Sequence, residues 1–172
     1  MRDWPAADRI ETDRLTLEPL RAEHAAEMAP MLDDAALHRY IGGSPASPAE
    51  LARRYRLQAA GRSPDGNQGW LNWVVRDRAS GAPVGTVQAT LTGDAGRLQA
   101  EVAWVVGTAY HGRGYAAEAA AGMVAWLRDR DVRRLVAHVH PEHRASRRVA
   151  ERLGLAPTGE LVDGEMRWAA GG

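Results

Sequence analysis

The chain contains no cysteine, no phenylalanine and no lysine, so arginine supplies all 22 of its basic side chains. Without cysteine it has no disulfide, no thiolate nucleophile and no zinc site of the kind that requires cysteine ligands. Without lysine it has no Schiff-base or pyridoxal-phosphate chemistry. The basic residues are balanced by 22 acidic ones. A basic face that would bind nucleic acid is therefore not expected.

Long apolar runs are also missing. No segment approaches the roughly 20 apolar residues that a membrane-spanning helix needs. Residues 1–14 are too polar and too acidic for a secretory signal. We therefore expect a cytoplasmic protein without a membrane partner. The length of 172 residues predicts one domain that can bury a sizeable core. We expect residues 13–170 to form that domain and residues 1–12 to be a loosely attached extension.

The spacing of apolar residues predicts the order of helices and strands. Strands are expected over residues 14–20, 70–78, 83–91, 98–106, 134–140, 159–162 and 165–168, and helices over 22–34, 48–60, 115–130 and 145–153. Pro30 predicts a kink or a break in the first helix. Ser47 followed by Pro48 predicts the start of the second helix. This order indicates an α+β domain with a mixed sheet and helices on its faces.

The turn that follows the fourth predicted strand is rich in glycine, with Gly107, Gly112 and Gly114 just before a helix. The first turn of a helix has unpaired backbone N–H groups and a partial positive charge, and glycine lets the backbone approach an anion closely. Such a turn is suited to binding phosphate. The P-loop lysine is missing, and Ala117 stands where a dinucleotide-binding turn has its last glycine. The alternative is a tight connection that binds nothing.

The sequence of this turn, HGRGYA from His111 to Ala116, resembles the Q/R-x-x-G-x-G/A motif of the GNAT superfamily of acetyl-CoA-dependent N-acetyltransferases. Other segments resemble that family in the correct order. TDRLTLEPL is similar to its first strand, WVVRDRASGAPVGTVQATL to its second and third, AEVAWVVGTAYHGRGYAAEAA to its fourth strand and cofactor loop, and HPEHRASRRVAERLGLAPTGE to the exit of its fifth strand and the next helix. The resemblance covers about Asp13 to Trp168 and is greatest for the RimJ/RimL-like branch, which includes acetylators of protein N-termini.

The resemblance implies a single GNAT-like domain with a mostly antiparallel sheet that splays between its fourth and fifth strands, and helices on both faces. It also implies acetyl-CoA as cosubstrate and no metal. The residues implied to contact the coenzyme are Trp104, Val105, Val106, His111, Gly112, Arg113, Gly114, Tyr115, Ala116, Ala117, His143 and Ser146. In the family the loop amides hold the pyrophosphate, and strand amides, here around Val105 and Val106, bind the thioester oxygen and the pantetheine.

Two of these positions depart from the family pattern. His111 replaces the usual Gln or Arg, so its contact with the phosphates is expected to depend on pH. His143 replaces the Asn that normally bonds the pantetheine arm, and an imidazole can replace only one of the hydrogen bonds of an amide.

Acetyl transfer to an amine needs a base for the amine proton and an acid or another stabilising group for the departing thiolate. Glu101 lies in an otherwise apolar strand and is the first candidate for the base, because we expect its carboxylate to be partly desolvated. A structural glutamate without a catalytic role is the alternative, and His138 and His140 are weaker candidates for the base. The family's usual acid, a tyrosine, is replaced here by Ala150. That change leaves Ser146 as the candidate acid, unless its hydroxyl bonds only the backbone.

Two other functions stay open on sequence alone. His138, His140 and His143 follow the spacing H-x-H-x-x-H, which resembles the zinc cluster of metallo-β-lactamase-type hydrolases. Glu142 replaces the expected Asp in that cluster, and no later histidine completes it. A non-catalytic acyl-CoA sensor would bind the coenzyme without turnover.

For an acetyltransferase, the expected acceptor is a protein N-terminus or a small amine. The segments expected to line its site are residues 32–43 and 70–73, in which acidic and aromatic side chains suit an amine. A homodimer is left open by the sequence.

Overall fold

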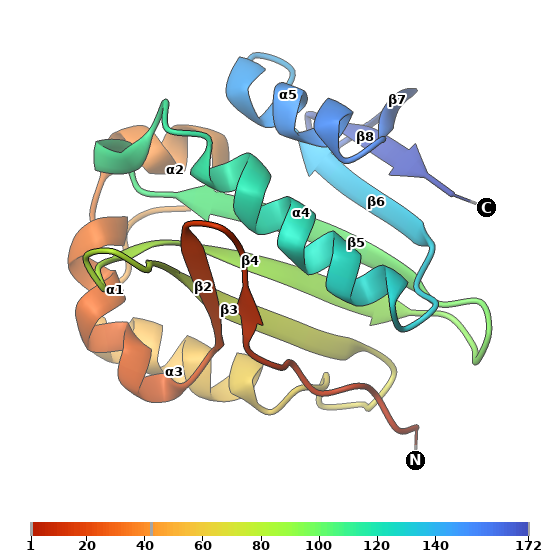
Figure 1. Ribbon diagram of the computed structural model, residues 1–172, viewed down its shortest axis with the longest axis horizontal. Helices are drawn as coiled ribbons and strands as arrows, with labels where there is room; N and C mark the ends of the chain where they lie inside the picture. Colours follow the sequence, from red (N-terminus) through yellow and green to blue (C-terminus); the bar gives the residue numbers. More distant parts are fainter. Residues whose placement is uncertain (1, 42, 172) are drawn as a thin grey trace.

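The computed structural model describes residues 2–41 and 43–171. Within those residues, eight strands form one sheet in the order β1-β2-β3-β4-β5-β6-β8-β7 (Figure 1). The strands are β1 (Ile10–Glu11), β2 (Leu15–Pro19), β3 (Gly69–Asp77), β4 (Pro83–Thr92), β5 (Gln99–Val106), β6 (Arg134–Val139), β7 (Ala156–Val162) and β8 (Glu165–Ala170). The helices are η1 (Ala22–His24), α1 (Ala25–Leu32), α2 (Ala35–Ile41), α3 (Pro48–Ala59), η2 (Thr108–Tyr110), α4 (Tyr115–Arg128) and α5 (Arg144–Arg152).

Most of these bounds lie within a few residues of the predicted ones, and α3 begins where the sequence predicts. Ser47 caps it, because its Oγ accepts a hydrogen bond from Glu50 N–H at 3.2 Å. Of the kink or break predicted at Pro30, the break is wrong, since α1 continues through Pro30 to Leu32. The helix ends only two residues later, at Leu32, so the proline lies in its last turn. The structure adds α2, which the sequence analysis missed although Asp34 accepts a hydrogen bond from Ala36 N–H at its start.

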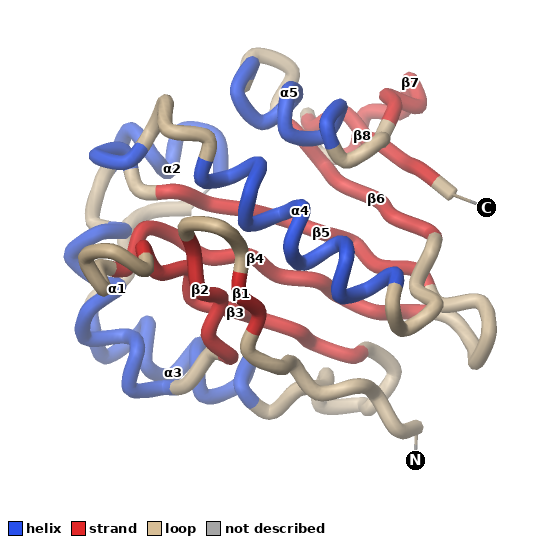
Figure 2. Tube along the Cα trace, in the orientation of Figure 1, coloured by secondary structure: helices blue, strands red, loops and turns tan. Residues whose placement is uncertain are grey.

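Helices cover both faces of the sheet, as predicted (Figures 1 and 2). One face packs against α4 and α5 through the larger apolar core, which includes Leu71, Trp73 and Met123. The other face packs against α1 and α3 through a smaller core that includes Met28 and Leu51. No helix in the part of the chain that the structure describes is both long and apolar enough to span a bilayer.

The sheet opens between β5 and β6, the fourth and fifth of the predicted strands. These parallel strands pair only over the start of β5, from Gln99 opposite Arg134 to Glu101 opposite Val136. Beyond Glu101, β5 stays paired with β4, while β6 continues beside β8. The predicted splay is therefore confirmed, and backbone groups of β5 that would meet a neighbouring strand there are left for another partner.

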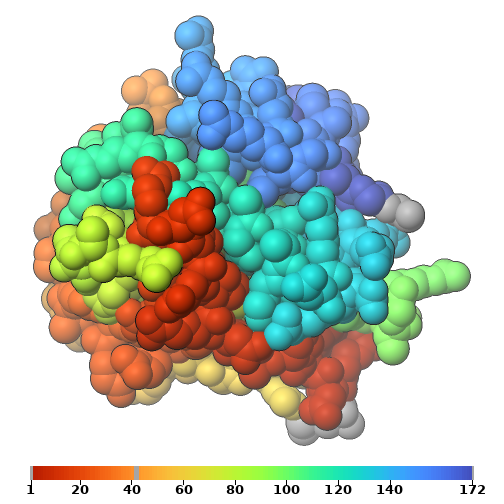
Figure 3. All heavy atoms as spheres, viewed as in Figure 1, coloured from red at the N-terminus to blue at the C-terminus, as the bar shows by residue number. Residues whose placement is uncertain are grey.

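The N-terminal residues are held more firmly than the sequence predicts. Ile10 and Glu11 form β1 and pair with β2. The indole N–H of Trp73 lies in the core and needs a partner, and it donates a hydrogen bond of 2.7 Å to Asp8 O. The Asp8 carboxylate also pairs with Arg130 at 2.6 Å. The expectation of a loose extension is wrong, and Figure 3 shows the N-terminal segment packed beside α4.

Candidate active site

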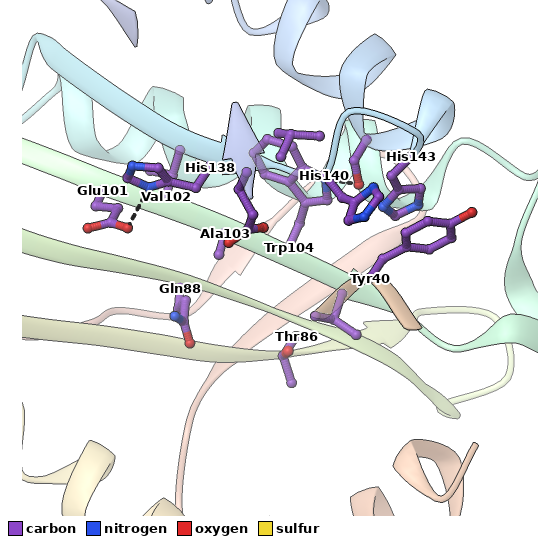
Figure 4. A pocket seen from close by; sticks show the side chains of 14 residues that line it. Tyr40, Thr86, Gln88, Glu101, Val102, Ala103, Trp104, His138, His140 and His143 are labelled. Carbon is purple, nitrogen blue, oxygen red and sulfur yellow. Dashed lines mark hydrogen bonds and ion pairs between the residues drawn. The ribbon is translucent and has the colours of Figure 1, made fainter. Parts of the chain in front are cut away.

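A cavity of about 280 Å³ lies where β5 and β6 separate (Figure 4). The residues predicted to act in catalysis or coenzyme binding that line it are Glu101, Trp104, Val105, His138, His140, His143 and Ser146. Figure 4 shows Glu101 and His138 toward one end, and Tyr40 with His140 and His143 toward the other. The sheet therefore brings together side chains that the sequence separates by more than forty positions.

Glu101 and His138 form a pair across the two parallel strands. His138 Nδ1 lies 2.9 Å from Glu101 Oε1. The Glu101 side chain is 56% exposed and that of His138 is 22% exposed. The expected desolvation of Glu101 is therefore wrong, because the strand opens to solvent where the carboxylate lies. When Nδ1 carries the hydrogen and donates it to Glu101, Nε2 of His138 is able to accept a proton.

A second carboxylate in the cavity, Glu165, was missed by the sequence analysis. Glu165 begins β8, which lies beside β6 and so reaches the same opening. Burial raises the pKa of its carboxyl above the ordinary value of 4.5, and the nearby imidazoles of His138 and His140 partly oppose this rise. No sequence pattern places the last hairpin against β6, so Glu165 could not have been selected. Thr86 and Gln88, which also line the cavity, were missed as well.

Tyr40 and two histidines form an aromatic cluster at the other end of the cavity. The rings of Tyr40 and His143 stack with their centroids 4.4 Å apart, and His140 meets the edge of Tyr40 at 5.3 Å. Burial lowers the pKa of His143, and the neighbouring His111 and His140 lower it further. The lowered pKa favours the neutral form of the His143 imidazole.

The alternative hypothesis of a metal cluster receives no geometric support. His138 is paired with Glu101 and His143 is stacked on Tyr40. Among residues 2–41 and 43–171, no group of three His, Asp or Glu side chains is arranged to hold a metal ion. A spacing of H-x-H-x-x-H specifies a site only when the imidazoles converge, and here they do not.

Ser146 and Trp104 meet in the wall of the cavity. The indole Nε1–H of Trp104 donates a hydrogen bond of 3.2 Å to Ser146 Oγ. Ser146 lies in the first turn of α5. Because its oxygen accepts this bond, the hydroxyl hydrogen of Ser146 is still able to be donated.

The glycine-rich loop follows the end of β5 and leads into α4. Gly112 and Gly114 have φ angles of 79° and 77°, a left-handed conformation that favours glycine. A Cβ added to Gly112 would meet nothing within 4 Å. Gly114 is the N-cap of α4 and has no side chain to bond the first N–H groups of the helix. The loop therefore presents an open backbone surface and uncapped helical donors, a combination that suits a phosphate.

Arg14 of the N-terminal region supports this loop, a contact that the sequence analysis missed. Its guanidinium donates to Arg113 O at 2.9 Å and pairs with Glu118 at 2.7 Å. It also lies 4.7 Å from the ring centroid of Tyr115. These contacts join the residue just before β2 to the loop and to the first turn of α4.

His111 also turns toward the backbone, with Nε2 2.7 Å from Val106 O. Because Nε2 makes this contact, Nδ1 is the ring nitrogen of His111 that is left to meet another group. The pH-dependent contact with phosphate stays a prediction.

Some residues of the two segments expected to line the acceptor site do line a cavity. Tyr40 lines the first cavity. Leu32, His38, Asn72 and Trp73 line a second cavity that adjoins it. Asp34 has another role, because its carboxylate caps α2 and accepts a hydrogen bond of 2.6 Å from Thr108 Oγ1.

Comparison with protein families matches residues 14–156 to the acetyltransferase (GNAT) domain, which is most of the chain. The chain belongs to the GNAT acetyltransferase family. GNAT enzymes take their acetyl group from acetyl-CoA. Three features of this GNAT acetyltransferase fit that cosubstrate: the open backbone surface at the loop glycines, the uncapped start of α4 and the unpaired side of β5. A search of curated protein sequences found no match.

Solved structures with this GNAT fold span nearly the whole chain. A GNAT-family acetyltransferase from Bacillus anthracis has a TM-score of 0.77 and 19% identity, covering 94% of this chain and 97% of its own. A protein described as a GNAT-family acetyltransferase from Bordetella pertussis has a TM-score of 0.68 and 26% identity, with the same coverages. RimL, a ribosomal L7/L12 α-N-protein acetyltransferase in complex with coenzyme A, has a TM-score of 0.74 and 15% identity, covering 94% of this chain and 97% of its own. The structural similarity to RimL shows a shared fold, but at 15% identity it shows no more than the fold. Membership of the RimJ/RimL-like branch therefore stays a prediction.

Proposed function

We propose that this GNAT acetyltransferase transfers an acetyl group from acetyl-CoA directly to a primary amine, on a protein N-terminus or a small molecule, within a ternary complex. One observation carries the proposal. Near its start β5 carries Glu101, paired with His138 in the open cavity, and just after its end it leads into the uncapped N-terminus of α4. The proposed proton acceptor thus lies on β5, and the proposed anion-binding backbone lies in the loop that joins β5 to α4.

The coenzyme side of the proposed site is made mainly of backbone. The amides of residues 111–117 would hold the pyrophosphate, and Trp104, Val105 and Val106 would lie along the pantetheine, with His143 and Ser146 on the facing side of the opening. When bound, acetyl-CoA supplies the acetyl group as a thioester. The chain has no cysteine, so an acyl-cysteine intermediate is impossible and direct attack by the amine is favoured.

The proton side of the proposed site is made of charged side chains. An acceptor amine is mostly protonated near pH 7 and must lose a proton before it attacks. In our proposal Glu101 attracts the ammonium and removes this proton, directly or through His138. Ser146 would donate its hydroxyl hydrogen toward the departing thiolate. The likeness to RimL supports a protein N-terminus as one member of the acceptor class.

Two measurements test the proposal. A calorimetric titration is expected to give binding of acetyl-CoA and of CoA, and each ligand is expected to stabilise the fold by about 2.7 kcal/mol when present at 100 times its Kd. A panel of amines incubated with acetyl-CoA is then expected to release free thiol with some members. Absence of coenzyme binding would contradict the proposal. Binding without thiol release from any amine would instead favour the acyl-CoA sensor.

A further inference from the structure

A second cavity, of about 190 Å³, adjoins the first on the face of the sheet covered by α1 and α3. Thr86, Gln88 and Val105 line both cavities, so the two meet at the middle of β4 and near the end of β5. This volume is below the roughly 300–1,000 Å³ of sites that enclose drug-sized ligands. A ligand enclosed there would be small.

Tyr55 of α3 lines this second cavity. Its side chain is 4% exposed, and its hydroxyl has no hydrogen-bond partner among the described residues. Burial raises the pKa of Tyr55 to about 12, so the hydroxyl stays neutral and keeps its hydrogen. A buried polar group without a partner is unfavourable. A ligand with a hydrogen-bond acceptor would supply the missing partner.

The two cavities differ in charge. The first has the carboxylates of Glu101 and Glu165 in its lining. The described lining of the second includes Arg54 and no acidic residue, and Arg54 forms no ion pair within the described part of the chain. A ligand that spans both would meet carboxylates at one end, and a guanidinium with a buried hydroxyl at the other.

We infer that the second cavity holds the body of the acceptor, and that this acceptor is a small amine with a carboxylate at the end opposite the amine. The inference rests on the proposed function, because it assigns the amine to the end with Glu101. A carboxylate accepts hydrogen bonds both from a guanidinium and from a tyrosine hydroxyl. A second ammonium at that end would meet Arg54 without any carboxylate. Polyamines and polycationic aminoglycosides are therefore disfavoured as acceptors.

The test uses three acceptors of the same chain length, which differ only in the distal group: the ω-amino acid, the amino alcohol and the diamine. We expect kcat/KM to fall in that order, measured as free thiol released from acetyl-CoA. In Tyr55→Phe the KM for the amino acid is expected to rise about tenfold, as for a lost hydrogen bond to a charged group, with a smaller effect on kcat. Arg54→Gln removes an exposed charge, and we expect the KM for the amino acid to rise about two- to fivefold.

Arg53→Gln is the matched control. It removes a neighbouring exposed arginine of α3 that does not line the cavity, and it is expected to leave the order and the KM values unchanged. A wild-type preference for the diamine would overturn the inference. So would a preference for the amino acid that stays the same in both Tyr55→Phe and Arg54→Gln.

A binding measurement separates this inference from the proposed function. The ω-amino acid is titrated calorimetrically into the wild-type protein and into Tyr55→Phe, each with CoA present. Weaker binding to Tyr55→Phe would support the cavity assignment even if no amine were acetylated. Absence of acetylation would contradict only the proposed function. Absence of binding to the wild-type protein would overturn the cavity assignment, even with an active enzyme.

Discussion

The two sides of the proposed site are built differently. The coenzyme side comes mainly from one continuous stretch, residues 104–117, and it offers mainly backbone groups. The acceptor side is made of side chains from separate elements, such as Tyr55 of α3, Gln88 of β4 and Glu165 of β8. A backbone surface depends on conformation and needs only a few glycines. A surface made of side chains can change residue by residue while the fold stays the same.

This contrast agrees with the low identity between this chain and its structural neighbours. Proteins that share 15–26% of their residues with it keep the same fold over most of their length. In our proposal the coenzyme constrains the loop before α4, whereas side chains such as Arg54 and Tyr55 are free to differ with the acceptor. Fold similarity therefore indicates the donor better than it indicates the acceptor.

The largest expected effect lies where the two sides meet, at Glu101. In Glu101→Gln we expect coenzyme affinity to be kept, because the change is nearly isosteric and lies away from the loop. We expect turnover to fall by roughly 10²–10⁴, the usual contribution of a general base. The loss should shrink as pH rises, because more of the acceptor amine is then already neutral. Steady-state rates measured across pH check this expectation.

Glu165→Gln is the comparison for Glu101→Gln, since it removes the other carboxylate of the same cavity. We expect a smaller loss of turnover, because Glu165 is not hydrogen-bonded to His138 as Glu101 is. Wild-type turnover in Glu101→Gln at every pH would remove Glu101 from the mechanism. A larger loss in Glu165→Gln would assign the proton to Glu165 instead.

The next effect tests whether the coenzyme side depends on backbone conformation. Gly114→Val is expected to weaken CoA binding about a hundredfold, or about 2.7 kcal/mol, because valine disfavours a φ of 77° and its methyl groups would occupy phosphate space. Gly96→Val is the control. Gly96 also has a positive φ, 82°, and open space around it, but it lies in the turn between β4 and β5.

Both valine variants are expected to lose similar stability, about 1–3 kcal/mol, for the strained backbone. Calorimetry with CoA and thermal unfolding separate binding from stability. Equal CoA affinity in Gly114→Val and Gly96→Val would mean that the loop is only a connection.

The same contrast decides what could be predicted from the sequence. The coenzyme loop could be found because its glycines and the following helix are consecutive, and the strands because apolar residues alternate along them. Glu165 could not be found, because its position depends on β8 pairing with β6. Tyr55 could not be found either, since a tyrosine on the buried side of an amphipathic helix looks like any core residue until its hydroxyl is seen to lack a partner. Asp34 was the one available sign of α2, as a cap before a short helical pattern.

The smallest expected effect concerns His143, which connects the two sides by stacking on Tyr40 of α2. Burial, helped by His111 and His140, places its pKa in the folded protein below the ordinary value of 6.5. The unfolded chain therefore binds a proton at this residue more readily than the folded protein does. The contribution of His143 to stability is full above about pH 6.5 and is lost as the pH falls toward the lowered value.

We expect His143→Asn to remove this component, because asparagine does not titrate and has the same place in the related family pattern. Urea unfolding of both proteins between about pH 8 and about pH 5 is expected to give a flatter profile of stability for the variant. This window lies above the range in which carboxyls with lowered pKa values, such as those of Glu18 and Asp34, lose their contribution. If stability changed with pH by the same amount in both proteins, protonation of His143 would not disturb its stacking on Tyr40. The aromatic cluster would then not make the contact between the two sides of the site sensitive to pH.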